Sequence, residues 1–485
     1  MVEGYLNALN DAKRSAIWID GQRWTYEAFH EIVMRVAAAA GKSESDYVGI
    51  YTDNNVYTYA ALLGVLLAGK GFVPLNQKFP DVRLESIVKD AGIEMILGCE
   101  QAEQRVKLFA ADAQFVRADQ LTESTTKIIT EGKGYILYTS GSTGVPKGIP
   151  ITRDNFRALS SALQQRFDIK PEDRVLQAFE LSFDVSLACC FMAWDKGAEL
   201  VVADLNGITA VNAFKAAYEQ KCTFVTLPPS ALFYLKRLRI VGSVVLPDVH
   251  TTLFTGEALQ YAVAKEWKKC APQSAIENAY GPTETTVWCL FYALDKNSEA
   301  QLINGLCPIG DVLHGLHCRI VDANGIDVAD ETRGELWVGG EQIFHGYSNN
   351  PEKTKEVLFT DANGMRWYKT GDIVVRNKQG NIVYVNRKDN QVQVNGYRVE
   401  LGEVEFAVRK AAGTDGVVVI AIDRNNVTEL IAFVEGKVDK QALTAKLTEQ
   451  LPPYMIPREI NTVAALPVNS SGKIDKQKLK EPYLS

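Results

Sequence analysis

The stretch Tyr135–Gly148 reads YILYTSGSTGVPKG and joins a short apolar segment to a loop rich in hydroxyls and glycine. The residues Tyr135–Tyr138 are typical of a buried strand. The following loop offers hydroxyl groups, exposed backbone N–H groups and the cation of Lys147. Because glycine lets the backbone approach closely and its amides can point at an anion, this mixture suits polyphosphate oxygens. The pattern predicts a strand that ends in a phosphate-binding loop, with an ordinary polar surface loop as the alternative.

Two better-known loops do not fit this stretch. A Walker A loop requires Gly-Lys-Ser/Thr, whereas Pro146 precedes Lys147 and Gly148 follows it. The nucleophile elbow G-x-S-x-G is excluded because the residues upstream of Ser142 do not match it.

Length and composition narrow the class of protein. The chain has 485 residues, 46% of them hydrophobic, which is enough for at least two domains with buried cores. The net charge is −7 without a cluster of Lys and Arg, so no nucleic-acid partner is expected. We see no signal peptide, and the longest apolar stretch, Tyr57–Gly69, is too short to span a membrane. The eight cysteines include no C-x-x-C pair, so we expect reduced thiols in a cytoplasmic protein rather than a zinc site or disulfides.

Strand-like and helix-like segments alternate through the first three-quarters of the chain. This alternation predicts an α/β fold with parallel sheets covered by helices. After about Gly334 the pattern becomes β-rich and ends in what we predict to be a small α+β domain. The predicted strands are Tyr47–Tyr51, Phe72–Leu75, Gly416–Ile422 and Glu429–Val434, the predicted helices are Val56–Lys70, Val82–Ala91 and Lys440–Gln450, and a hairpin is predicted from Ile373–Arg376 and Ile382–Val385.

Further motifs follow the Gly/Ser/Thr loop in a fixed order. They are GEAL at Gly256–Leu259, NAYGPTET at Asn278–Thr285, GELWVGG at Gly334–Gly340, YKTGD at Tyr368–Asp372, NRKDNQVQVNGYRVELGEVE at Asn386–Glu405, LPPYMIP at Leu451–Pro457 and NSSGKID at Asn469–Asp475. Together they resemble the motifs of the adenylate-forming superfamily, which includes acyl-CoA synthetases, luciferases and nonribosomal peptide synthetase adenylation domains. The resemblance covers nearly the whole chain.

The resemblance implies a division of the chain into two domains. Residues 1–388 would form the adenylation core, with parallel-rich sheets, helices and a β-barrel-like part. Residues 389–485 would form a small, mobile α+β lid. Asp389 would be the hinge, although the run Arg387–Asn390 taken alone is compatible with an ordinary hairpin exit.

The reaction implied by the resemblance has two halves, with ATP as the nucleotide. A carboxylate attacks the α-phosphorus of ATP and releases pyrophosphate, and a thiol then attacks the acyl-adenylate and releases AMP. The first half needs no general base because a carboxylate is ionised at pH 7. Its difficulty is the approach of an anion to a polyanion, so catalysis rests on positioning and fixed positive charge.

The resemblance assigns roles to individual residues of the ATP site. Glu284 would hold Mg²⁺, a hard cation that prefers carboxylate and phosphate oxygens. Thr283 would donate to the α-phosphate, and Asp372 would accept from the ribose hydroxyls. Tyr280 would stack on adenine, and Arg387 would contact the ribose or a phosphate. The expected ATP-binding residues are Thr139, Ser140, Gly141, Ser142, Thr143, Gly144, Lys147, Gly256, Glu257, Asn278, Ala279, Tyr280, Gly281, Asp372 and Arg387.

Lys473, near the C-terminus, matches the lysine that would bridge the substrate carboxylate and the α-phosphate. Without its flanking motif it would be one more solvated lysine. Lys147 and Lys473 cannot easily share one site throughout, and the family resolves this by rotating the small domain about the hinge. One orientation would bring Lys473 in, and the other would present Val392–Gly396 to the thiol.

The segment Phe183–Ser186 resembles the FDxS element of amino-acid-activating domains, in which the Asp pairs with the substrate ammonium group. A helix-capping or turn role for Asp184 is the alternative. The pocket has no charge beyond Asp184 and Lys473, so a neutral side chain is predicted. Trp288 should narrow the pocket and Ala188 should widen it, so the size of the substrate side chain is not predicted. The expected substrate-binding residues are Asp184, Val185, Ala188, Thr226, Leu253, Thr255, Ala279, Val287 and Trp288.

The thiol acceptor is the least determined part. Gln393 and Asn395 replace the usual Lys and Arg of the motif after the hinge, and Asn76 stands where the family usually has Asp. The chain has no room for a carrier domain after Lys473, so we expect a free-standing enzyme that loads a separate phosphopantetheinyl carrier protein. D-alanine ligases of this kind are a sub-case. The alternatives are an acyl- or aryl-CoA ligase that uses free coenzyme A, and a degenerate nucleotide-binding module.

Overall fold

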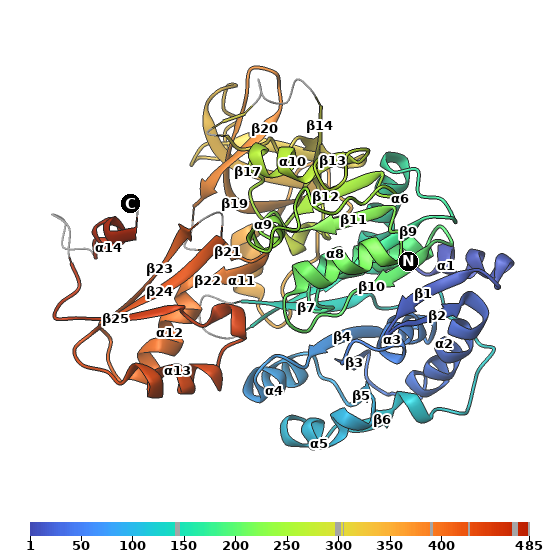
Figure 1. Cartoon of the computed structure of the whole chain (residues 1–485). Coiled ribbons are helices and arrows are strands. Elements are labelled where there is room, and N and C mark those ends of the chain that lie inside the picture. The colour runs from blue at the N-terminus through green and yellow to red at the C-terminus, as the bar shows by residue number, and fades with distance from the viewer. Residues whose placement is uncertain are drawn as a thin grey trace.

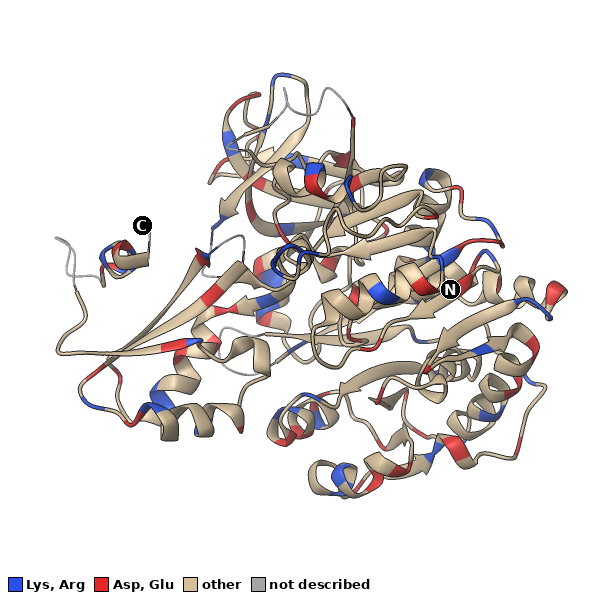
Figure 2. Ribbon diagram, in the orientation of Figure 1, with Lys and Arg blue, Asp and Glu red and all other residues tan. Residues whose placement is uncertain are grey.

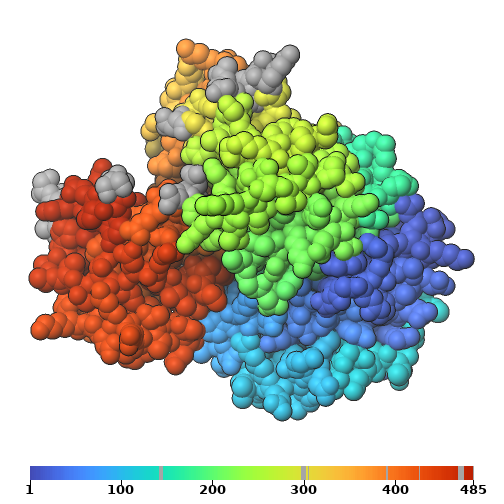
Figure 3. Space-filling model, in the orientation of Figure 1, coloured from blue at the N-terminus to red at the C-terminus, as the bar shows by residue number. Residues whose placement is uncertain are grey.

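The fold is known from a computed structural model of the chain, and it consists of a large N-terminal part and a smaller C-terminal lobe (Figure 1). The space-filling view shows this lobe (orange to red) against the blue and green remainder (Figure 3). The residues that the structure describes are 1–140, 146–295, 302–303, 305–388, 391–424, 427–467 and 474–483.

A six-stranded sheet occupies the first third of the chain and has the order β6-β5-β3-β4-β7-β8. All its neighbouring strands run parallel except the β7–β8 pair. The strands and helices predicted between residues 47 and 91 are confirmed. The strands are β3 (Tyr47–Thr52), β4 (Gly71–Asn76), β5 (Met95–Gly98), β6 (Gln114–Arg117), β7 (Tyr135–Thr139) and β8 (Lys147–Ile151). The helices are α2 (Tyr26–Ala40), α3 (Val56–Leu67), α4 (Asp81–Asp90) and α5 (Glu100–Phe109).

A nine-stranded sheet has the order β15-β14-β13-β12-β11-β9-β10-β1-β2, and its six central strands are parallel. It lies above the six-stranded sheet in Figure 1. The strands are β1 (Ser15–Ile19), β2 (Gln22–Thr25), β9 (Arg174–Gln177), β10 (Glu199–Val202), β11 (Phe224–Leu227), β12 (Thr251–Thr255), β13 (Ala275–Tyr280), β14 (Leu290–Leu294) and β15 (Asp311–Val312). The helices are α1 (Glu3–Ala8), α6 (Arg153–Arg166), α7 (Asp184–Trp194), α8 (Thr209–Glu219), α9 (Ala231–Arg237) and α10 (Tyr261–Trp267).

One hydrophobic core joins the two sheets. Almost all residues of helices α3 and α7 are buried, on every side of each helix, and many of them belong to this core. In α7, Val185 is the only residue that is not buried. A helix that is apolar all round belongs in the interior of a protein. The start of α7, which carries Asp184, is therefore held rigidly by the core.

The predicted β-rich region is a five-stranded antiparallel sheet, and the hairpin predicted between residues 373 and 385 is confirmed by β19 and β20. Strand β19 pairs with β17, β18 and β20 along its length. The elements are β16 (Leu316–Val321), β17 (Arg333–Gly340), α11 (Pro351–Val357), β18 (Leu358–Thr360), β19 (Arg366–Arg376) and β20 (Ile382–Arg387).

The C-terminal lobe is α+β, as predicted, and packs around a core of its own. Its long strands β23 and β24 are antiparallel, and β25 lies parallel to β24. The elements are β21 (Gln391–Val394), β22 (Tyr397–Glu400), α12 (Leu401–Ala412), β23 (Val417–Arg424), β24 (Val427–Glu435), α13 (Lys440–Thr448), β25 (Glu459–Val463) and α14 (Lys476–Lys480). Short 3₁₀ turns are Leu9–Asp11, Ala118–Gln120, Thr283–Thr285, Pro453–Met455 and Glu481–Tyr483.

The distribution of charge and the length of the helices bear on the possible partners of the chain. Positions of Lys and Arg are interspersed with positions of Asp and Glu along the ribbon of both parts (Figure 2). Among the described residues, no helix is both long enough and apolar enough to cross a membrane.

Candidate active site

A cleft of about 970 Å³ lies where β7, β11, β12 and β13 end, and the β21–β22 hairpin of the C-terminal lobe forms its other wall. Because these four strands point the same way within their sheets, their carboxyl ends bring loops together at one edge. Most of the predicted site residues line this cleft. They are Thr139, Ser140, Asp184, Val185, Thr255, Gly256, Glu257, Asn278, Ala279, Tyr280, Gly281, Thr283, Asp372 and Arg387.

Other predicted residues lie outside the described part of the chain or behind the cleft wall. Gly141, Ser142, Thr143, Gly144, Asp389 and Lys473 lie outside the described residues. Ala188, Thr226, Leu253, Val287 and Trp288 are buried behind the wall. Lys147 and Glu284 are held by ion pairs to the C-terminal lobe.

Asp372, which is predicted to bind the ribose, has partners for both carboxylate oxygens. Arg387 Nη1 lies 2.8 Å from Oδ1, and the hydroxyl of Tyr280 donates to Oδ2. Burial raises the pKa of Asp372, while the charge of Arg387 and the hydrogen bond from Tyr280 oppose that rise. The three residues predicted to contact the adenosine part of ATP thus form one cluster.

The loop after β13 is folded unusually tightly. Thr286 and Val287 both have positive φ angles, 59° and 68°, which are uncommon for residues with branched side chains. A Cβ at Gly281 would lie 2.3 Å from the carbonyl oxygen of Val287, so only glycine fits there. The amide of Gln342, which the sequence did not single out, braces the loop by donating to the carbonyls of Thr285 and Trp288. This loop fixes the position of Glu284.

Glu284 is fully buried, and each of its carboxylate oxygens has a partner. Tyr347 donates to Oε1 at 2.8 Å, and Arg398 Nη1 lies 2.7 Å from Oε2. Burial alone would raise the pKa of Glu284, but the charges of Arg398 and Lys147 and the bond from Tyr347 outweigh it and hold the pKa at about 2. No group of three or more His, Cys, Asp or Glu among the described residues could hold a metal ion. In this arrangement of the two parts, Glu284, which is predicted to hold Mg²⁺, is paired with Arg398 and Tyr347.

Lys147 and Ser140, from the ends of the phosphate loop, both contact the C-terminal lobe. Lys147 Nζ lies 3.2 Å from Glu400 Oε1. Burial and the nearby charge of Arg398 lower the pKa of Lys147. Ser140 Oγ donates to the carbonyl of Arg398 at 3.0 Å and accepts from the backbone N–H of Glu400 at 3.1 Å.

Asp184 is the first residue of α7, and the N-cap position belongs to Phe183, which makes no side-chain cap. Burial raises the pKa of Asp184 to about 6, although the Thr283 side chain and the backbone of Val185 act in the opposite direction. Its Oδ2 is buried and has no hydrogen-bond partner among the described residues. A buried carboxylate oxygen without a partner is costly to maintain. The site therefore suits a cation delivered by a ligand.

Several of the other residues predicted to bind the substrate lie close to one another. Thr226 and Leu253 are neighbours across β11 and β12, and Leu253 shares a hydrophobic cluster with Ala188 and Trp288. Trp288 Nε1 donates to Thr255 Oγ1 at 2.9 Å. This hydrogen bond fixes the orientation of the buried indole beside Thr255, which lines the cleft.

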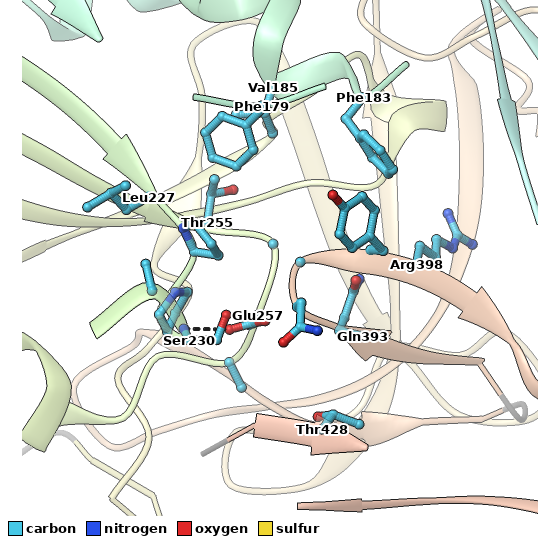
Figure 4. A pocket seen from close by; sticks show the side chains of 18 of the residues that line it. Phe179, Phe183, Val185, Leu227, Ser230, Thr255, Glu257, Gln393, Arg398 and Thr428 are labelled. Carbon is cyan, nitrogen blue, oxygen red and sulfur yellow. Dashed lines mark hydrogen bonds between the residues drawn. The ribbon is translucent and has the colours of Figure 1, made fainter. Parts of the chain in front are cut away.

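The segment Val392–Gly396, which is predicted to face the thiol, belongs to the β21–β22 hairpin and lines the cleft. The Asn395-Gly396 turn has two positive φ angles, 51° and 83°, as a tight hairpin turn requires. Gln393 lies across the cleft from Glu257, whereas the Arg398 side chain points away from Thr255 and Glu257 (Figure 4). The ring of Tyr397 stacks on Tyr454 at 4.1 Å. The Asn-Gly pair between two apolar segments was a signal for this hairpin, but sequence alone could not show what it touches.

The comparison with protein families decides the identity. The profile of the AMP-binding enzyme family matches residues 7–348. The chain belongs to the AMP-binding enzyme family. This confirms the predicted resemblance to the adenylate-forming superfamily.

The relatives of this AMP-binding enzyme agree with that assignment. It is 31% identical to a linear gramicidin synthase protein of Brevibacillus parabrevis over 484 residues, which cover 96% of this chain and 9% of the relative. The chain thus spans about a tenth of that relative's length. It also resembles the Vibrio cholerae adenylation domain AlmE in complex with glycyl-adenosine-5'-phosphate, with a TM-score of 0.88, 23% identity and 99% and 97% of the two chains covered. A structure of holo-PA1221, described as an NRPS protein with adenylation and PCP domains bound to a vinylsulfonamide inhibitor, matches with a TM-score of 0.86, 23% identity and 99% and 84% of the two chains covered. These structures support the fold.

Proposed function

We propose that this chain activates a neutral amino acid with ATP as an aminoacyl-adenylate and then transfers the aminoacyl group to the thiol of a phosphopantetheinyl carrier protein. It would thus be an AMP-forming acid–thiol ligase. The observation that carries this proposal is the buried, unpartnered Oδ2 of Asp184 beside the cleft, for which the described residues supply no hydrogen-bond donor. An α-ammonium group supplies the charge and the hydrogen bonds that this oxygen lacks.

The positions of Asp184, Thr283, Asp372 and Arg387 along the cleft support the first half of the reaction. Asp184 anchors the ammonium group, so the substrate carboxylate extends toward Thr283 and the nucleotide end, where Asp372 and Arg387 lie. One carboxylate oxygen then forms a bond to the α-phosphorus, and the bond to the β-phosphate oxygen breaks with release of pyrophosphate. The chain contributes position and charge, which suffice because the nucleophile is already ionised. The role of Lys473 remains a prediction from its motif.

The second half joins a thiol sulfur to the acyl carbon and releases AMP, while the thiol proton passes to solvent. The β21–β22 hairpin lines the cleft with Gln393 and Asn395 in the present arrangement. This is the orientation that the resemblance associates with thiol attack. The division at Asp389, the hinge and the Mg²⁺ requirement are parts of the same proposal.

A carrier protein is favoured over coenzyme A as the acceptor because the solved structure of holo-PA1221 combines adenylation and PCP domains. The alternative, an acyl- or aryl-CoA ligase, would leave Asp184 buried without a cationic partner. A cytoplasmic location stays a prediction.

A panel of carboxylic acids in ATP–pyrophosphate exchange tests the proposal. Neutral amino acids should stimulate exchange, while their des-amino analogues should do so weakly. Glutamate and lysine should be poor substrates because the residues predicted to surround the substrate side chain carry no charge beyond Asp184 and Lys473. Preference for a charged side chain, or equal rates with and without the amino group, would contradict the proposal.

A further inference from the structure

One face of the nine-stranded sheet closes the cleft on the side of Asp184. Thr226 and Leu253 are paired neighbours on β11 and β12, and Thr255 and Ala279 are paired neighbours on β12 and β13. Because paired residues share a face and side chains alternate along a strand, these four side chains point the same way. The cleft reaches Thr255 and Ala279, whereas Thr226 and Leu253 are 0% exposed. The wall of the cleft is therefore formed by the ends of these strands.

Helix α7 lies over this face of the sheet. Asp184 is its first residue, and Ala188, four positions later, lies on the same side of the helix. Burial raises the pKa of the Cys189 thiol to about 12, and a hydrogen bond with the side chain of Thr226 opposes that rise. The side chains of Cys189 and Thr226 are thus neighbours, and Ala188 beside them is only 1% exposed. The small side chain of Ala188 is enclosed by protein and does not widen the cleft.

The indole of Trp288 lies beside Thr255 on the same face and is held at three points. Its Nε1 donates to Thr255 Oγ1 at 2.9 Å, and its ring packs edge-on against Phe291 with the ring centroids 5.7 Å apart. Its backbone carbonyl accepts from Gln342 at 2.8 Å. Since protein interiors are close-packed, an indole held at its nitrogen, its ring and its backbone is a fixed boundary.

The proposed function leaves this wall as the direction for the substrate side chain. The ammonium group lies at Asp184 and the carboxylate is directed toward Thr283, so the side chain extends either along the open cleft or toward the wall. The open cleft has to admit the nucleotide at Asp372 and the thiol at the β21–β22 hairpin. The size of the side chain is then limited by the distance to the wall.

We propose that the substrate is glycine or alanine, and that Trp288 and Leu253 exclude amino acids with larger side chains. The proposal rests on the proposed function, because it names the substrate class of the same site. A side chain longer than a methyl group would have to displace fully buried groups, and overfilling a packed interior is unfavourable.

ATP–pyrophosphate exchange with glycine, alanine, 2-aminobutyrate and leucine tests this limit on the wild-type chain. Glycine or alanine should be the best substrate. The value of kcat/KM for 2-aminobutyrate, which has one methylene group more than alanine, should be roughly 10- to 200-fold lower than that of the better of these two. A difference below about tenfold, or a preference for leucine, would overturn the proposal.

Two buried tryptophans that bond to the same strand provide a matched pair of variants. Trp267 is 1% exposed and its Nε1 donates to Thr252 Oγ1 at 2.8 Å, but Thr252 points to the opposite face of β12 from Thr255. Trp288→Phe should raise the ratio of kcat/KM for 2-aminobutyrate to that for alanine by about tenfold or more. Trp267→Phe should leave this ratio at the wild-type value. Equal ratios in the two variants would show that Trp288 does not set the size limit, and urea denaturation would show that both are folded.

Calorimetric titration with glycyl and leucyl sulfamoyl-adenosine, which are unreactive analogues of the adenylates, measures the fit apart from activity and needs no variant. The glycyl compound should bind the wild type at least about tenfold more tightly than the leucyl compound. Equal affinities, or tighter binding of the leucyl compound, would overturn the size limit and leave the proposed function intact. If neither compound binds and no amino acid stimulates exchange, the proposed function fails, and the size limit fails with it.

Discussion

Replacing the Asp184 carboxylate by an amide of the same shape is the sharpest test of what the site binds. In Asp184→Asn the substrate ammonium group would be buried opposite a neutral side chain. Removing one partner of a buried ion pair costs about 3–5 kcal/mol. At 1.4 kcal/mol per factor of ten, we expect kcat/KM for the amino acid to fall roughly 150- to 4000-fold. Asp184 is only 8% exposed, which places it in this range rather than in the range of surface pairs.

The assay is amino-acid-dependent ATP–pyrophosphate exchange with the best substrate of the panel and with its des-amino analogue. The analogue has no ammonium group, so it should lose little or nothing in the variant. Asp168→Asn is a matched control because the side chain of Asp168 is 88% exposed. It should leave both substrates unchanged.

The pH profile gives a second view of the same group. Burial raises the pKa of Asp184 to about 6 in the free protein, and only the ionised carboxylate pairs with ammonium. The value of kcat/KM for the amino acid should therefore be constant above about pH 6 and fall toward tenfold per pH unit below it. The profile of Asp184→Asn should lack this limb.

A loss of less than about fivefold, well below the cost of an unpaired buried charge, would refute the pairing. Equal losses for the amino acid and its des-amino analogue would also refute it, because they would show a general disturbance of the cleft.

Two further predictions concern the lysine near the C-terminus and the indole of the pocket. Lys473→Ala should lower the rate of adenylate formation, measured by ATP–pyrophosphate exchange, by about 10²- to 10³-fold. It should spare thioester formation from a preformed adenylate, measured by loading of the carrier protein. Equal loss of both steps would contradict the proposed role of Lys473. Trp288→Ala should lower the free energy of unfolding by about 3–5 kcal/mol in urea denaturation, because it removes a fully buried indole and its bond to Thr255. The same variant should accept larger neutral side chains, and a stability loss below about 1 kcal/mol would show that the indole is not a packed wall.

Local pattern was enough to predict most of the fold. The alternation between residues 47 and 91 gave the correct strands and helices, because apolar periodicity and turn residues act over a few positions. The helix predicted over Val56–Lys70 ends at Leu67 in the structure, and Gly69, with φ of 79°, marks the turn that follows it. The ordered motifs predicted the family, and the family assignment is confirmed.

The site was predicted less completely. The motifs placed Tyr280, Asp372 and Arg387 together, and the structure joins them in one cluster. Gln342 was missed because no local sequence pattern indicates that a single glutamine far along the chain donates to the carbonyls of Thr285 and Trp288. Arg398 and Glu400 were quoted within a motif, but their partners Glu284 and Lys147 are 114 and 253 residues away.

The sequence by itself determined the family of the chain and the residues available to its chemistry: the Gly/Ser/Thr loop, the acidic residues of the ordered motifs and the aspartate at the start of α7. Tertiary structure alone decided the state of those groups. Whether Glu284 faces a metal or an arginine, and whether Asp184 keeps a free oxygen, depends on which distant segments bury them. Burial and pairing set the energy of a charge, and both arise from contacts that no local stretch of sequence contains.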